Sequence, residues 1–140
     1  MSLKTTTQLI LFTAMGRQTS IKIFGNDYPT ADGTCIRDYV HVSDLADAHV
    51  AAVEWLAAGN SSETFNLGNG QGVSVAEVVK AVERITGKEI VVDNCARRPG
   101  DPPILISDSA KAMRILGWKP QFPDVDHQVA HAWKWFRERD

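Results

Sequence analysis

Segments with a helical hydrophobic period dominate this chain, and the strand-like segments between them are few and short. The clearest helical segment spans residues 43–59, where the acidic residues Asp44, Asp47 and Glu54 fall on one narrow stripe and nearly every other residue is Ala, Val, Leu or Trp. This pattern predicts a helix that is buried on most of its circumference. A complete α/β sheet requires more strands than this chain supplies, so we expect a helix-dominated part of a larger α/β unit.

Hydrophobic period and turn signals place the other elements. The segment Ser74-Val75-Ala76-Glu77 fits a capping box at the start of a helix that Gly87 ends. We expect Ser43 or Asp44 to cap the helix over residues 43–59. The remaining expected elements are a helix over 6–17, strands over 21–24, 37–42, 65–67 and 89–92, a helix from 108 or 109 to 116, and a last helix from about 123.

Length and composition limit the possible functions. The chain has 140 residues, 44% hydrophobic and 23% charged, which suits a single globular domain over residues 1–140. A net charge of −2 argues against a nucleic-acid partner. No apolar run reaches the roughly 18 residues of a membrane span. The two cysteines, Cys35 and Cys95, are expected to be reduced thiols in a cytoplasmic protein.

A glycine cluster at residues 68–72 follows a strand-like segment and precedes a helix. That is the context of a dinucleotide-binding loop, but the fingerprint would need glycine where Val73 stands. Glycines at this spacing can present backbone N–H groups to an anion. The alternative, which we favour, is a tight turn that needs positive φ.

A second candidate is the run Arg97-Arg98-Pro99-Gly100-Asp101. Guanidinium groups bind phosphates through paired hydrogen bonds and keep their charge at neutral pH. A carboxylate at Asp101 could accept two ribose hydroxyls. An ordinary surface loop has the same composition, so the motif alone leaves both interpretations open.

A third candidate is Arg37, which could supply another phosphate contact or form a structural ion pair with Asp38 or Asp44. The chain contains no complete catalytic set: it has no Walker loop, no nucleophile elbow and no Tyr-x-x-x-Lys. His127 and His131 share a helix face but lack a third ligand nearby, which argues against zinc. We therefore expect no catalytic and no metal-binding residues.

Several runs together resemble the UDP-glucose 4-epimerase family, whose members are extended short-chain dehydrogenase/reductases. The run Phe24-Gly25-Asn26-Asp27-Tyr28-Pro29-Thr30 is the most specific of them. The others lie at residues 32–34, 37–49, 65–68, 97–101, 116–118 and 132–135. The resemblance implies the C-terminal, substrate-binding part of a Rossmann-type fold.

The resemblance also implies binding roles for individual residues. Phe24 and the backbone near Lys22 would line a uracil pocket, and Asp101 would hold the ribose hydroxyls. Leu105 falls where the family has a residue that limits the sugar pocket. Arg37 and Arg98 would hold the diphosphate from opposite sides.

In that family the N-terminal half carries the NAD loop and the Tyr-x-x-x-Lys pair, and this chain lacks both. The resemblance therefore implies a UDP-sugar-binding half that is inactive alone, with NAD bound only by the full-length enzyme. The helix over 43–59 would expose apolar surface that normally faces the Rossmann sheet, so we expect homo-oligomers. Alternatives are a non-catalytic interaction domain, or the same half of another nucleotide-sugar epimerase, dehydratase or decarboxylase.

Overall fold

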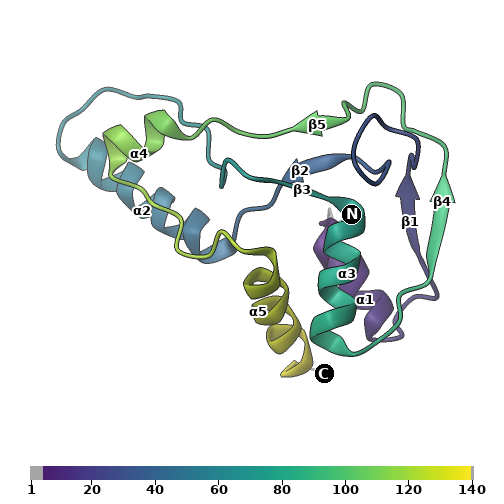
Figure 1. The fold of residues 1–140 in the computed structure, drawn as a ribbon. Helices are drawn as coiled ribbons and strands as arrows, with labels where there is room; N and C mark the ends of the chain where they lie inside the picture. The colour runs from purple at the N-terminus through teal and green to yellow at the C-terminus, as the bar shows by residue number, and fades with distance from the viewer. Residues whose placement is uncertain (1–4, 140) are drawn as a thin grey trace.

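The computed structural model describes residues 5–139, which contain both helices and short strands (Figure 1). This mixed, helix-dominated architecture confirms the expected fold class. The elements are α1 (Thr6–Ala14), β1 (Ile21–Phe24), β2 (Ile36–Asp38), α2 (Val42–Ala57), β3 (Gly72–Ser74), α3 (Val75–Thr86), β4 (Val92–Cys95), β5 (Ile104–Leu105), α4 (Ala110–Leu116) and α5 (Val125–Arg137).

The strands form two small sheets rather than one. In the first, β1 pairs in parallel with β4, and Phe24 lies opposite Cys95. In the second, β2 lies between β3, which is antiparallel to it, and β5, which is parallel. Arg37 of β2 lies opposite Leu105 of β5. Because β5 follows β4 closely in the chain, the connecting loop 96–103 runs from one sheet to the other.

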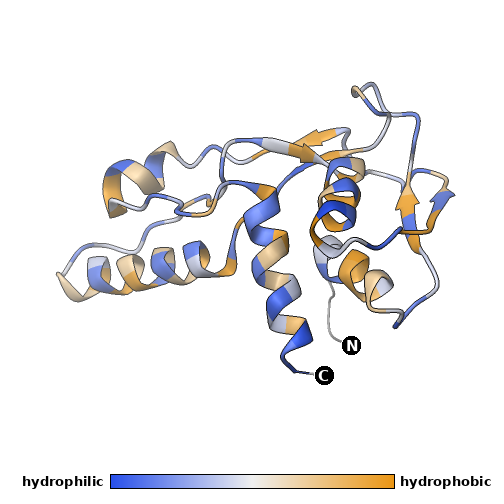
Figure 2. Ribbon diagram, turned by 60° about the horizontal axis from the view of Figure 1, so that its bottom comes forward, coloured by the Kyte–Doolittle hydropathy of each residue, from blue (hydrophilic) through white to orange (hydrophobic). Residues whose placement is uncertain are grey.

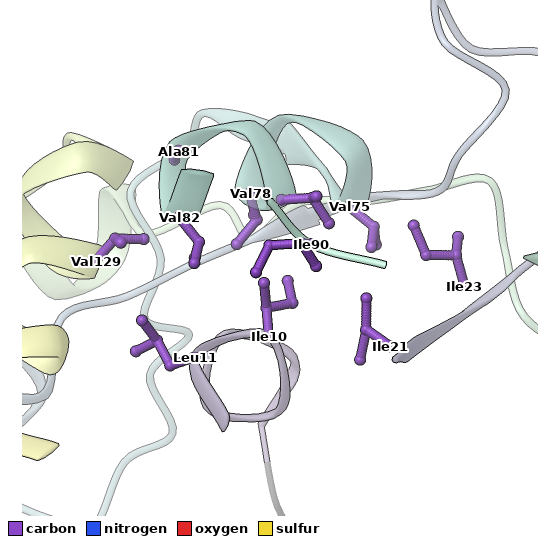
Figure 3. Packing of buried hydrophobic residues seen from close by; sticks show 11 residues of the cluster. Ile10, Leu11, Ile21, Ile23, Val75, Val78, Ala81, Val82, Ile90 and Val129 are labelled. Atoms are coloured by element: carbon purple, nitrogen blue, oxygen red, sulfur yellow. The ribbon is translucent and has the colours of Figure 1, made fainter. Parts of the chain in front are cut away.

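The larger core lies between α1, α3, α5 and β1 (Figure 3). The amphipathic face of α3 packs against α1 and α5, and Val78, Val82 and Val129 are fully buried there. The capping box of Ser74 and Glu77 is present, and Gly87 ends α3 with a left-handed φ of 66°. These local predictions are confirmed. At about 1.5–3 kcal/mol for each large aliphatic side chain, this cluster contributes much of the folding free energy.

A smaller core joins α2 to α4 and contains Ala48, Ala112 and Trp118. Asp44, only 1% exposed, connects this core to the segment that follows α4. Its carboxylate accepts hydrogen bonds from the backbone N–H groups of Gln121 (2.8 Å) and Phe122 (3.1 Å). Trp118 Nε1 donates to the Asp44 carbonyl at 2.7 Å. A carboxylate near a helix N-terminus with two donors is a stable arrangement despite its burial.

The prediction that α2 is buried on most of its circumference is wrong for the structure described. Val42, Val50, Val53 and Leu56 are 74%, 58%, 66% and 51% exposed. Figure 2 shows α2 running away from the larger core, with hydrophobic and hydrophilic bands alternating along it. The apolar side chains are there as the sequence indicates, but no described element covers that face.

Other boundaries also differ from expectation. Residues 65–67 form no strand. The second strand ends at Asp38 rather than at residue 42, where α2 begins. His41 rather than Ser43 or Asp44 is the N-cap of α2, and its Nδ1 accepts from the Ser43 N–H at 3.1 Å. The strand expected over 89–92 lies instead at Val92–Cys95. Within residues 5–139, no helix combines the length and apolar character needed to cross a bilayer.

Candidate functional site

A cavity of about 450 Å³ opens between β1, β2 and loop 96–103. Apolar residues such as Leu9, Ile23 and Val75 line part of it. Cations and a carboxylate are also in the lining. Of the residues assigned to substrate binding, those that line this cavity are Lys22, Phe24, Arg37, Arg98 and Asp101. The structure thus brings together side chains from three separate segments of the chain.

All four residues of strand β1 line the cavity. Ile21 and Ile23 are 5% and 4% exposed and also belong to the larger core, whereas Lys22 is exposed and Phe24 is half-buried. The Arg98 guanidinium carbon lies 3.8 Å from the centroid of the Phe24 ring. This cation–π contact holds Arg98 at the rim of the cavity without neutralising its charge.

Arg37 forms an ion pair with Asp101, not with Asp38 or Asp44. Its Nη2 lies 3.1 Å from Asp101 Oδ1, and its Nη1 donates to the Ile36 carbonyl at 2.8 Å. Both side chains are partly shielded, at 21% and 33% exposure. The cavity therefore holds a cation–anion pair and two further cations, Lys22 and Arg98, which favours a ligand with both hydroxyl groups and negative charge.

The two adjacent arginines have different surroundings. Arg98 lines the cavity, whereas Arg97 lies against the loop that follows β1. Arg97 Nε donates to Asp27 Oδ1 at 2.7 Å, and its guanidinium carbon lies 4.3 Å from the centroid of the Tyr28 ring. This hydrogen bond with Arg97 holds the pKa of Asp27 below its ordinary value. Of the two arginines, Arg98 is the one that lines the cavity.

Loop 25–34 is also anchored at its far end, by contacts that the sequence analysis missed. Asp32 Oδ1 accepts from the Thr34 N–H at 2.9 Å, and Asp32 Oδ2 accepts from the Ser74 hydroxyl at 2.5 Å. Burial raises the Asp32 pKa, but the hydrogen bonds from Ser74 and Thr34 outweigh it and leave the pKa below normal. The spacing Asp32-Gly33-Thr34 is typical of an Asx turn and could have indicated this anchor.

The glycine cluster over 68–72 does not form an anion site. The backbone N–H groups of Asn69 and Gly70 donate to the Asp38 carboxylate, at 2.8 and 3.2 Å. Gly70 has a φ of 68°, and a Cβ on Gly68 would lie 2.3 Å from Asp38 Oδ2. The positive φ that the turn interpretation requires is therefore present at Gly70, but the segment before it is not a strand. These residues do not fit the pyrophosphate of a dinucleotide, because a carboxylate occupies the amides that would bind it.

Leu105 lies outside the cavity. It pairs with Arg37 across β2 and β5, but its side chain is 59% exposed and is not part of the lining. Among residues 5–139, no group of three or more His, Cys, Asp and Glu side chains is placed to hold a metal ion. Two histidines do contact each other, His131 Nδ1 and His41 Nε2, at 3.0 Å.

Comparison with known proteins gives consistent results. Residues 2–126 match the family model described as GDP-mannose 4,6 dehydratase. The UDP-glucose 4-epimerase of Lacticaseibacillus casei is 50% identical over 127 residues, which is 91% of this chain but 38% of the relative. The chain therefore spans well under half the length of that protein.

Solved structures agree with the sequence comparison. A UDP-glucose 4-epimerase crystal structure superposes with a TM-score of 0.93 and 44% identity, over 98% of this chain and 42% of that one. The enzyme from Stenotrophomonas maltophila, solved with NAD and a formylated UDP-arabinopyranose, gives 0.90 and 40%, over 98% and 40%. The resemblance found in the sequence is thereby confirmed.

Proposed function

The chain belongs to the nucleotide-sugar-modifying family that the GDP-mannose 4,6 dehydratase model describes, and we propose that its cavity binds the UDP moiety of a UDP-sugar. The observation that carries this proposal is the meeting of Arg37, Arg98 and Asp101 at one cavity. These residues come from β2 and from loop 96–103. A volume of about 450 Å³ suits a ligand of nucleotide size.

Each side chain has a chemical reason for its role. Phe24 offers an aromatic face to the base, next to the backbone of Lys22. Arg98 and Arg37 supply the fixed positive charge that a diphosphate requires. Asp101 is an acceptor for ribose hydroxyls, and its pairing with Arg37 orients its carboxylate. Leu105 is proposed to limit the sugar that extends beyond the diphosphate, from its exposed place on β5 beside Arg37.

The proposed role is binding and positioning rather than the chemical step. Remote binding energy on the UDP moiety fixes a sugar for chemistry that occurs elsewhere. The NAD of longer relatives supplies hydride chemistry when bound, and residues 68–72 are not suited to hold it, as the contacts of Asp38 indicate. The chain alone is therefore proposed to bind UDP without epimerase turnover.

Calorimetric titration of the chain with UDP tests this function. We expect measurable binding that Arg98→Ala weakens by about ten- to a hundredfold, the loss of one or more charge-assisted hydrogen bonds. Arg84→Ala is the matched control, because Arg84 forms an exposed Arg–Asp ion pair with Asp126 at 2.6 Å on another face. Absence of binding at millimolar UDP would contradict the proposal.

A second candidate function is an interaction domain, and the exposed apolar side chains of α2 favour it. We propose that a second copy of the chain covers this face in solution. The resulting dimer or higher oligomer would hide Val50, Val53 and Leu56 from water. Supplying the N-terminal part of a relative in trans separates the two functions: restored epimerase activity supports the first, and an inactive complex supports the second.

A further inference from the structure

Arg97 connects the two loops that flank the cavity, although it does not line the cavity itself. Its Nε bonds the Asp27 carboxylate, its Nη2 donates to the Asp27 backbone carbonyl, and its guanidinium covers the Tyr28 ring. We call these three residues, Arg97, Asp27 and Tyr28, the Arg97 clasp. An exposed ion pair alone contributes little, but the clasp adds a backbone hydrogen bond and an aromatic contact.

The chain path around the clasp is tightly determined. Gly25 has a φ of 89°, and a Cβ there would lie 2.4 Å from Tyr28 Cε2 and 2.8 Å from Arg97 Cγ. The Gly25 N–H donates to the Cys95 carbonyl at 2.8 Å, and Tyr28 is 4% exposed. Glycine is therefore required where the two loops cross. The close approach of Arg97 and Tyr28 to Gly25 fixes the direction in which the Arg97 side chain extends.

The cavity residues depend on the same loop. Residues 96–100 are all exposed, so core packing does not hold them in place. Arg98 follows Arg97 directly and stacks on Phe24. Asp101 donates its N–H to the Arg98 carbonyl at 3.2 Å, and its own carbonyl accepts from the Tyr28 hydroxyl at 3.5 Å. Between β4 and Asp101, the clasp and the contact of Arg98 with Phe24 therefore attach this loop to the rest of the chain.

We propose that Arg97 is a positioning residue, which holds loop 96–101 so that Arg98 and Asp101 face the cavity. The proposal rests on the proposed UDP site for its functional consequence, but not for its structural one. Of the two adjacent arginines, Arg97 holds the loop in place and Arg98 faces the ligand. Oriented charges bind a diphosphate better than mobile ones, because less side-chain freedom is lost on binding.

The ligand-free chain provides the first test. In the native chain we expect the Phe24 ring to shift the NMR signals of the Arg98 side chain upfield, and the hydrogen bond of the Asp101 N–H to slow its exchange. In Arg97→Ala we expect the ring-induced shift to shrink by about half or more, and Asp101 exchange to accelerate about tenfold or more. Arg84→Ala removes a comparable exposed ion pair and should change neither signal. Native shifts and exchange in Arg97→Ala would overturn the proposal.

UDP titration provides the second test. Arg97→Ala should weaken UDP binding by about five- to tenfold. Arg97→Lys should recover part of this loss, since an ammonium can pair with Asp27 but cannot provide the planar fork. Displaced Arg98 signals with unchanged UDP affinity would also overturn the proposal. If the native chain binds no UDP, the proposed function fails, and the Arg98 signals still decide whether the clasp positions the loop.

Discussion

Arg37 Nη2 and Asp101 Oδ1 lie 3.1 Å apart, although 64 residues separate them in the chain. Arg37 comes from the central strand β2, and Asp101 from the loop that precedes β5. The pair places a cation and a hydroxyl acceptor at the same wall of the cavity. It also means that neither residue can be changed without altering the electrostatics of the other.

Asp101→Asn should therefore separate two parts of the ligand. We expect uridine binding to weaken about tenfold, because a neutral amide is a poorer acceptor for ribose hydroxyls. Pyrophosphate binding should stay equal or become tighter, since Arg37 loses its anionic partner. Calorimetry with the two ligands measures both effects. A parallel loss of both affinities would argue against the division of roles between Arg37 and Asp101.

The buried carboxylate of Asp44 should be important for stability. Asp44→Ala leaves the N–H groups of Gln121 and Phe122 without their acceptor, and we expect a cost of about 2–4 kcal/mol in the free energy of unfolding. Urea denaturation measures it. Asp47→Ala on the same helix is the control, because Asp47 is exposed and should change stability by less than about 0.5 kcal/mol. Equal effects at the two positions would refute this role.

Stability should fall in mild acid because of His41. Its Nδ1 accepts from the Ser43 N–H, so Nε2 carries the proton that faces His131. Burial and the neighbouring His131 lower the pKa of His41, and Asp44 opposes this only in part. The unfolded chain thus binds the proton more readily.

The contribution of His41 to stability is fully present above the unfolded pKa of about 6.5, and it declines as pH falls toward the lower native value. His41→Asn keeps an N-cap but cannot titrate, so it should flatten the stability profile between about pH 5 and 7. Thermal melts across this range measure the slope. A native-like slope in the variant would assign the pH dependence to another group.

Ser74 should couple the start of α3 to loop 25–34. Ser74→Ala removes the acceptor for the Glu77 N–H and the donor to Asp32, at a cost of about 1–2 kcal/mol. The lowered pKa of Asp32 stabilises the fold above its unfolded value near 3.8 and ceases to do so as pH falls through the native value. The variant should therefore lose less stability on acidification below pH 4. A profile parallel to that of the native chain would show that Ser74 does not influence Asp32.

Self-association should depend on the exposed face of α2. Val53→Lys places a charge where 66% of the valine is exposed, and we expect a larger monomer fraction by light scattering. Val91→Lys is the matched control, as Val91 is 57% exposed at a distance from α2. The native chain is expected to be oligomeric at micromolar concentration. A monodisperse native monomer would exclude the proposed interface.

The amino-acid sequence alone determined the features that depend on neighbours within a few residues. The capping box of Ser74, the end of α4 at Gly117, the start of α5 near Asp124 and strand β1 were all predictable, because caps and turns are made by local hydrogen bonds. The motifs also indicated the correct family. A family motif is recognised from residue types and their spacing, so it can be identified without knowing which distant residues contact one another in the fold.

Only the tertiary structure decided which distant groups meet. Strand β4 begins at Val92 because it pairs with β1, and strand β5 forms because it pairs with β2. Local propensity does not encode these pairings. The partner of Arg37, and the separate surroundings of Arg97 and Arg98, likewise depend on how two loops cross. A charged side chain can reach several partners of opposite sign, and the geometry of the fold selects one of them.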